Sequence, residues 1–310
     1  MSYGVNRTDG YHLKDLDGLG WELTVCNSLW PENSPCRRVL ENGDSYGAML
    51  FRFLEKHVPM GKITRVLEVG GGYGFLMKDF LDAARNLRVT MLDISPFLLE
   101  RQKEILGDRG VTFMLGDFLS TEPPIPDGVD LVIMNENLGD LPTVLDMTTE
   151  DLERDDGDPV LAEVRYFFRT FDLPPPATSP FNVNLGALQA VRKICEAGVP
   201  RVFLSEHSCE ASAKGEPASL LSLSPSGNPE RIRLRGHDEY TIRFSCLEAV
   251  AKRYGYRTLR GPLADYLPPI ISDEVRFLLT SGASRRDEDE IIRQFIDDLY
   301  AYEYLLLIKE

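Results

Sequence analysis

The stretch Glu68-Val69-Gly70-Gly71-Gly72-Tyr73-Gly74 carries alternating glycines at a junction between two kinds of element. The apolar run Arg65–Gly70 leads into it and is predicted to form a buried strand. Phe75–Ala84 follows with the apolar spacing of a helix. Glycine has no Cβ, so the backbone can turn tightly here and approach a ligand closely. The stretch therefore predicts a strand–turn–helix unit with a ligand at its turn.

Short apolar runs and amphipathic segments continue to alternate along the rest of the chain. This alternation predicts an α/β protein with a mostly parallel seven-stranded sheet and helices on both faces. The further predicted strands are Arg88–Ile94, Val111–Asp117, Val129–Asn135, Arg201–Glu206, Tyr256–Leu259 and Tyr302–Ile308. The architecture is that of a Rossmann-like sheet.

Acidic residues close two of the predicted strands. Asp93 ends the second strand, 93 − 74 = 19 residues after Gly74. An acid at this distance suits the two hydroxyls of a ribose. Asp117 ends the third strand, where a carboxylate can accept a hydrogen bond from the exocyclic amine of adenine. Because parallel strands end at one edge of the sheet, we expect both acids to line one crevice with the glycines.

The glycine spacing separates the classes of nucleoside ligand. A dinucleotide-binding turn needs a small residue where this chain has Phe75, and no Gly-Lys-Ser/Thr of a phosphate-binding loop is present. The pattern Glu-x-Gly-x-Gly-x-Gly, followed by the two strand-end acids, resembles the class I S-adenosylmethionine (SAM) methyltransferase family over roughly residues 63–137. An NAD-dependent oxidoreductase is correspondingly disfavoured.

The resemblance implies a Rossmann-like class I methyltransferase fold, SAM as the cofactor and S-adenosylhomocysteine (SAH) as its product. It implies that Glu68 and the glycines hold the methionine half of the cofactor. It also implies that Asp93 binds the ribose hydroxyls and that Asp117 and Phe118 meet the adenine. The residues at the matching positions are Glu68, Gly70, Gly72, Gly74, Asp93, Asp117 and Phe118, with Asn135 beside them.

The fourth predicted strand runs into Asn135-Glu136-Asn137-Leu138-Gly139-Asp140-Leu141-Pro142. This segment resembles that of the MidA-type family, which are protein arginine methyltransferases linked to assembly of respiratory complex I. The resemblance implies a protein side chain, arginine-like, as the methyl acceptor. A guanidinium nucleophile needs carboxylates to orient it, and Glu136 and Asp140 are the candidates. His207, after the fifth strand, is a candidate general base.

Two alternatives to a protein acceptor stay open. A small-molecule O- or N-methyltransferase needs only a different lid over the same cofactor site. A SAM-binding assembly or interaction factor without catalysis would keep the glycines and acids but have an unproductive loop after the fourth strand. The sequence does not distinguish these acceptor classes.

The predicted domain organisation is an N-terminal helical cap, 1–62, and a SAM-binding domain, 63–310. Within the cap, Tyr46 to Leu54 has helical spacing after a Ser45 N-cap. Insertions are predicted at about 138–182, 209–240 and 264–300. In the second of them, Arg231–Arg235 alternates strictly and predicts a strand with one basic face.

Composition excludes several classes of protein. The 310 residues contain 34 Lys plus Arg and 49 Asp plus Glu, for a formal net charge of −15. Nucleic-acid backbones favour basic proteins, so we expect no nucleic-acid partner for this acidic chain. No apolar run reaches the roughly 20 residues that a membrane helix needs, and no signal peptide is recognised. The oligomeric state is left open.

Cysteine and histidine usage points to a reduced compartment without a metal. The five cysteines are widely spaced and form no Cys-x-x-Cys pair, which predicts free thiols in a cytoplasmic protein. The four histidines are scattered along the sequence. His12 and His57 are expected to be incidental, and His237 to approach the crevice. We therefore predict no metal site.

Overall fold

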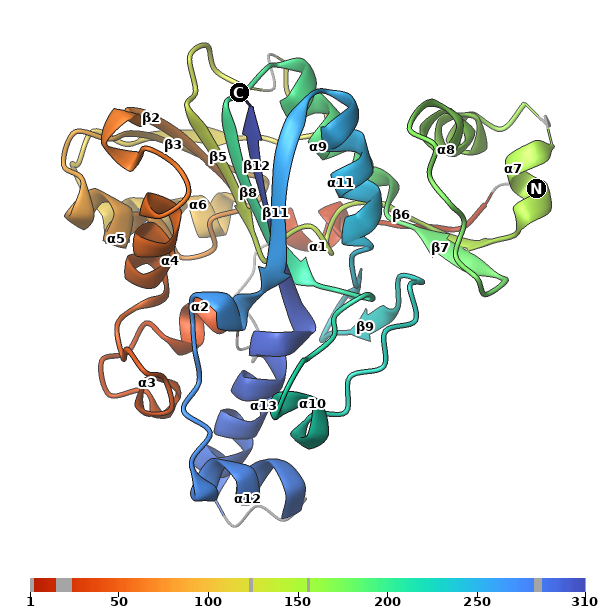
Figure 1. The fold of residues 1–310 in the computed structure, drawn as a ribbon. Coiled ribbons are helices and arrows are strands. Elements are labelled where there is room, and N and C mark those ends of the chain that lie inside the picture. The colour runs from red at the N-terminus through yellow and green to blue at the C-terminus, as the bar shows by residue number, and fades with distance from the viewer. Residues whose placement is uncertain (1–2, 15–23, 123–124, 155–156, 282–285, 310) are drawn as a thin grey trace.

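A seven-stranded sheet forms the centre of the computed structural model, which describes residues 3–14, 24–122, 125–154, 157–281 and 286–309 (Figure 1). Its strand order is β4-β3-β2-β5-β8-β12-β11, and β12 runs in the direction opposite to the other six strands of this sheet. The predicted mostly parallel seven-stranded sheet is confirmed. The strands are β2 Arg65–Val69, β3 Arg88–Asp93, β4 Thr112–Leu115, β5 Leu131–Asn135, β8 Arg201–His207, β11 Tyr256–Pro262 and β12 Tyr302–Lys309.

Side chains alternate between two cores on opposite faces of this sheet. On β5, Leu131 and Ile133 join one cluster of buried residues, and Val132 and Met134 join the other. The first cluster includes apolar side chains of α4, Tyr46–Glu55, and α5, Phe75–Ala83. The second includes those of α9, Leu185–Glu196, and α11, Phe244–Arg253. Helices therefore cover both faces, as predicted.

The remaining helices lie mostly around the carboxyl edge of the sheet and beyond it (Figure 1). Helix α13 packs against α2 and α3, so a late segment of the chain meets an early one there. Two of the remaining helices lie elsewhere, since α6, Pro96–Leu106, packs on β3 and β4, and η1, Met60–Lys62, directly precedes β2. The others are α1 Asp9–His12, α2 Val25–Ser28, α3 Pro35–Arg38, α10 Pro217–Leu220, η2 Leu263–Asp265, α12 Asp273–Ser281 and α13 Asp287–Ala301.

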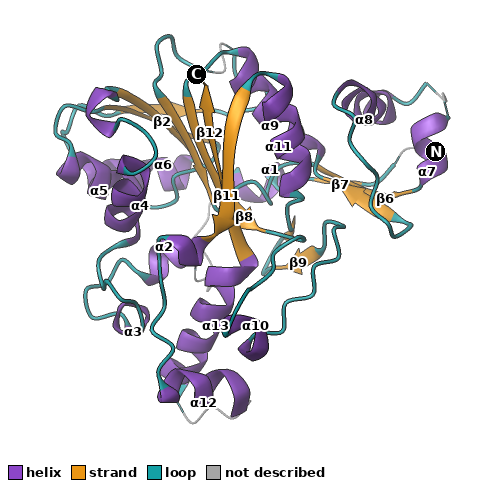
Figure 2. Cartoon of the chain, in the orientation of Figure 1, coloured by secondary structure: helices purple, strands orange, loops and turns teal. Residues whose placement is uncertain are grey.

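A second, three-stranded sheet extends from the body of the molecule (Figure 2). Its strands are β1 Val5–Asn6, β6 Thr143–Met147 and β7 Phe181–Val183, in the order β1-β6-β7. Helices α7 Thr149–Glu153 and α8 Pro159–Thr170 lie in the same excursion. The sequence did not predict this sheet, because β1 and β7 have only two and three residues, too few to show a period, and their partner β6 has five.

The basic strand is confirmed over a shorter range than predicted. β9, Arg231–Arg233, pairs with β10, Asp238–Tyr240, and Arg231 forms an ion pair with Asp238. Residues 155–156 and 282–285, inside two of the predicted insertions, lie outside the described residues. The division into a cap, 1–62, and a domain, 63–310, stays a prediction. Among the described helices, none is long and apolar enough to cross a membrane.

Helix α4 lies very close to α5 because of a glycine. A Cβ built on Gly47 would lie 2.6 Å from the Leu76 carbonyl oxygen and 2.8 Å from the Asp79 carboxylate. A Cβ on Gly61, in contrast, would meet nothing within 4 Å. The close approach holds α4 against α5 and so against the central sheet.

We expect Gly47→Ala to lower the free energy of unfolding by about 1–3 kcal/mol, because a backbone carbonyl cannot move aside as a side-chain end can. Urea denaturation followed by circular dichroism measures this change. Gly61→Ala is the matched control and should change stability by less than about 0.5 kcal/mol. An unchanged midpoint for Gly47→Ala would contradict the close packing described for α4 and α5.

Candidate functional site

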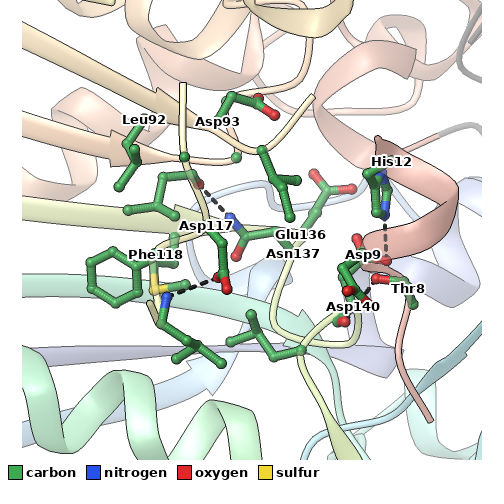
Figure 3. A pocket seen from close by; sticks show the side chains of 18 of the residues that line it. Thr8, Asp9, His12, Leu92, Asp93, Asp117, Phe118, Glu136, Asn137 and Asp140 are labelled. Carbon is green, nitrogen blue, oxygen red and sulfur yellow. Dashed lines mark hydrogen bonds and ion pairs between the residues drawn. The ribbon is translucent and has the colours of Figure 1, made fainter. Parts of the chain in front are cut away.

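A cavity of about 690 Å³ opens at the carboxyl ends of β2, β3, β4 and β5. Parallel strands of an open α/β sheet place their ligands at this edge. Figure 3 shows Phe118 on one side of the cavity and His12 and Asp140 on the other. The sequence-predicted residues that line it are Glu68, Gly70, Gly72, Asp93, Asp117, Phe118, Asn135, Glu136 and Asp140. Gly74 and His207 are not among the lining residues.

The glycine turn has the backbone conformation that the sequence predicted. Gly70 and Gly72 have φ of +63° and +52°, where side chains are strained. A Cβ on Gly70 would lie 2.5 Å from Asn137 Nδ2, whereas one on Gly72 would meet nothing and would extend into open space. Gly74, with φ of +86°, is the N-cap of α5 and lies against Gln102. Its position indicates a packing role.

Two buried carboxyl groups form the acidic floor of the cavity. Asp93 is 3% exposed, and it accepts hydrogen bonds from the Ser95 N–H at 2.9 Å and Gln102 Nε2 at 2.7 Å. Burial raises its pKa to about 6. Glu68 is 2% exposed, and its Oε2 has no hydrogen-bond partner. Burial, together with the charge of Asp93, raises the pKa of Glu68 to about 8. Such a pair favours a cationic ligand.

A short loop after β4 forms the opposite end of the floor. The Asp117 carboxylate accepts hydrogen bonds from the Leu119 N–H at 2.9 Å and the Ser120 hydroxyl at 3.0 Å. Phe118 is buried, and Lys193 Nζ donates to its carbonyl oxygen at 3.1 Å. The loop is therefore held by its own carboxylate and by α9, which keeps an aromatic ring at the cavity wall.

Glu136 has a structural task that the sequence did not indicate. It has a φ of +55°, rare for a residue with a side chain. Its two carboxylate oxygens accept backbone hydrogen bonds from Val25 at 2.9 Å and Cys26 at 3.0 Å. Oε1 also accepts from Asn135 Nδ2, and Asn135 Oδ1 in turn accepts from Tyr46 and Ser205. Glu136 thus holds α2 at the cavity, and its burial raises its pKa.

Asp140 lies in the cavity wall with His12, and His237 lies beside Asp140 without lining the cavity. Its Oδ1 is 2.9 Å from His12 Nε2 and 3.5 Å from His237 Nε2. The sequence suggested that His12 is incidental. The structure corrects this, because His12 lines the cavity. Burial alone would lower the pKa of His12, but the hydrogen bond and charge of Asp140 outweigh it and raise the pKa.

His207 is a correction to the sequence-based expectation. It ends β8, but it pairs across the sheet with Tyr302, whose ring centre lies 3.7 Å from its own. Its Nε2 is 3.5 Å from the Asp298 carboxylate of α13. Strand β12 and helix α13 therefore cover this histidine, and it does not reach the cavity. The sequence showed where β8 ends but not which elements pack over that end.

Several lining residues carried no signal in the sequence. Thr8, Asp9 and His12 come from the N-terminal segment, and Lys193 comes from α9. They lie far along the chain from the glycine turn and belong to no motif that could have linked them to it. Only the folded chain brings them to the same cavity.

Residues 66–153 match a family model described as a methyltransferase domain. Over 70 residues the chain is 36% identical to a malonyl-[acyl-carrier protein] O-methyltransferase from Anoxybacillus flavithermus, covering 23% of this chain and 26% of that protein. Over 84 residues it is 39% identical to a mitomycin biosynthesis 6-O-methyltransferase from Streptomyces lavendulae, covering 26% of this chain and 23% of that protein. The matches span about a quarter of the length of these curated relatives.

A solved structure extends the likeness to most of the fold. An uncharacterized ACR superfamily protein from Burkholderia thailandensis superposes with a TM-score of 0.52 at 14% identity, over 85% of this chain and 79% of that chain. The Rossmann-like methyltransferase fold is confirmed by the strand order and by the matched domain, which contains the glycine turn, Asp93 and Asp117. The finer MidA-type resemblance stays a hypothesis.

The buried state of Glu68 predicts a pH-dependent stability. Its pKa is raised above its ordinary value of 4.5 to about 8, so its contribution to stability is full below pH 4.5 and is lost as the pH rises through 8. Glu68→Gln cannot ionise. We therefore expect the unfolding free energy of the variant, relative to that of the unsubstituted protein, to rise by a few kcal/mol from about pH 5 to about pH 9. Urea denaturation at each pH measures this difference.

The exposed Glu100→Gln is the control for this comparison, and its stability relative to the unsubstituted protein should not vary over the same interval. A constant difference between Glu68→Gln and the unsubstituted protein would show that Glu68 is already ionised in the fold.

Proposed function

We propose that this chain is a SAM-dependent methyltransferase that transfers a methyl group to an oxygen or nitrogen of a small molecule. The observation that carries the proposal is the convergence of Gly70, Gly72, Asp93 and Asp117 on one cavity. These residues end three adjacent strands and lie within the segment that matches a methyltransferase domain.

The residues at the cavity fit the cofactor in three places. Glu68, an unpartnered buried acid, suits the ammonium of the methionine half, and the open space at Gly72 admits that half close to the backbone. Asp93 suits the ribose hydroxyls, with Gln102 and Ser95 orienting its carboxylate. Asp117 and Phe118 suit the adenine amine and ring. The acidic floor favours a ligand with a positive charge.

When bound, SAM supplies a methyl group on a cationic sulfonium, which an acceptor displaces in line. The role of the protein is to orient the cofactor and the acceptor and to exclude water from them. Glu136 holds α2 over the cavity through the Val25 and Cys26 N–H groups. The Trp30 ring stacks on the Phe75 ring with their centres 4.1 Å apart, which adds an apolar wall beside α2. Alignment of the acceptor in such a site supplies much of the rate.

Two observations support a small acceptor over a protein arginine. Glu136 accepts three hydrogen bonds, two of them from the backbone of α2, so a guanidinium would have to compete with the contacts that hold this helix in place. The curated relatives that match the domain are named as O-methyltransferases. A protein acceptor remains the alternative, in which Asp140 would have to orient the nucleophile alone.

We expect Asp93→Asn to weaken SAH binding about 10- to 100-fold, since an amide loses the charge that accepts the ribose hydroxyls. Isothermal titration with SAH measures this, and urea denaturation checks that the fold persists. Asp82→Asn, an exposed carboxylate paired with Lys78 and Arg109, is the control and should bind SAH like the unsubstituted protein. Equal binding by Asp93→Asn would remove the ribose role, and absence of SAH binding altogether would overturn the cofactor.

We expect labelled methyl groups from SAM to pass to hydroxyl- or amine-bearing small molecules and not to arginine-containing peptides. Scintillation counting after separation of the products measures the transfer. Labelling of peptides alone would favour the protein acceptor. SAH binding without transfer to either class would favour a SAM-binding factor that has no catalytic activity.

A further inference from the structure

His12, Asp140 and His237 converge from three separate segments at the side of the cavity. His12 ends α1, Asp140 lies in the loop after β5, and His237 precedes β10. Their nearest ligand atoms, one from each residue, all lie within 4.8 Å of one another. His237 Nε2 is also 3.0 Å from Glu239 Oε1. The scattered positions of these residues led the sequence analysis to expect no metal.

We propose that His12, Asp140 and His237 bind a divalent first-row transition-metal ion. Two imidazole nitrogens and one carboxylate are a ligand set that such ions prefer over Mg²⁺ or Ca²⁺, and three protein ligands leave coordination positions open. His12 and Asp140 line the cavity, so a molecule in the cavity can reach the ion. Glu239 adds a second negative charge next to His237.

The direction of the side chains supports an ion at the centre. Both rings present Nε2, the outer nitrogen, to the same Asp140 oxygen, at 2.9 Å and 3.5 Å. The His237 side chain is 4% exposed and that of His12 14% exposed, so water has little access to the nitrogens. Each Nε2 also lies within hydrogen-bond distance of a carboxylate, His12 of Asp140 and His237 of Glu239. A divalent ion that displaces the shared proton binds these same atoms, since metal binding releases protons from its ligands.

The ligands are held in place by their surroundings. Thr8 Oγ1 donates to the Asp140 carbonyl at 2.9 Å, and Asn6 Nδ2 donates to the Asp238 carbonyl at 2.7 Å, next to His237. The Tyr11 ring stacks on His237 with centres 4.2 Å apart. Hydrogen bonds and packing contacts around metal-binding side chains orient them and raise the affinity for the metal. The surroundings of these three residues therefore form the site before the ion binds.

The metal site indicates the chemical class of the methyl acceptor, and this part of the inference rests on the proposed function. An ion held by His12, Asp140 and His237 would lower the pKa of an acceptor hydroxyl bound to it, so that the hydroxyl proton would pass to solvent. The acceptor oxygen would then form the bond to the methyl carbon of SAM while the carbon–sulfur bond breaks and its electron pair stays on sulfur. Small molecules with two adjacent oxygen donors are the favoured acceptors.

Titration of the chelator-treated, tag-free protein with Co²⁺ tests the site directly. We expect one equivalent to give saturable visible absorption bands, which Zn²⁺ then removes by displacement. His237→Ala and Asp140→Asn should each weaken Co²⁺ binding at least about 100-fold. His57→Ala is the matched control, because His57 packs on Phe53 away from this cluster, and it should bind Co²⁺ like the unsubstituted protein.

SAH titration of the same preparations separates the two proposals. His237→Ala that binds SAH normally but has lost Co²⁺ supports the metal site in an intact fold. Absence of saturable Co²⁺ bands in the unsubstituted protein, or bands unchanged in both His237→Ala and Asp140→Asn, overturns the metal site and leaves the cofactor proposal intact. Co²⁺ binding without SAH binding would support the metal site and overturn the proposed cofactor.

Discussion

The parallel pairing of β2 with β3 and β5 is the constraint on which the rest of the structure depends. Val69 pairs with Leu92 and with Met134, so these strands end side by side. Because each chain segment leaves the sheet at the same edge, Gly70, Asp93 and Asn135 arrive at one place. The two cores on the opposite faces of the sheet keep this register, since a shift by one residue would exchange the buried sets.

The buried acids show how the site and the fold share one set of residues. Glu136 lies at the cavity, yet its oxygens hold the backbone of α2, so the N-terminal segment is part of the site. Asp93 accepts from the start of α6 through Ser95 and from Gln102 on the same helix. Carboxylates that orient a ligand are themselves oriented by backbone and amide donors, which lowers the cost of burying them.

Residues that no motif marked complete one side of the site. Thr8 and His12 come from the first turn of the chain, and His237 comes from the turn between β9 and β10. They meet Asp140 because β1 pairs with β6 and because Asn6 binds the backbone of Asp238. Such contacts join residues 143 − 6 = 137 and 238 − 6 = 232 positions apart, and no local period or spacing records them.

The sequence by itself determined the sheet, the order of strands and helices within 63–137, and the glycines and acids at the strand ends, because burial and chain reversal leave local periodic patterns. Only the tertiary structure decided that Glu136 anchors α2, that β12 and α13 cover His207, and that His12 joins Asp140 and His237. Those outcomes depend on packing between distant segments, and the free energy of such packing is not written in any one stretch of the chain.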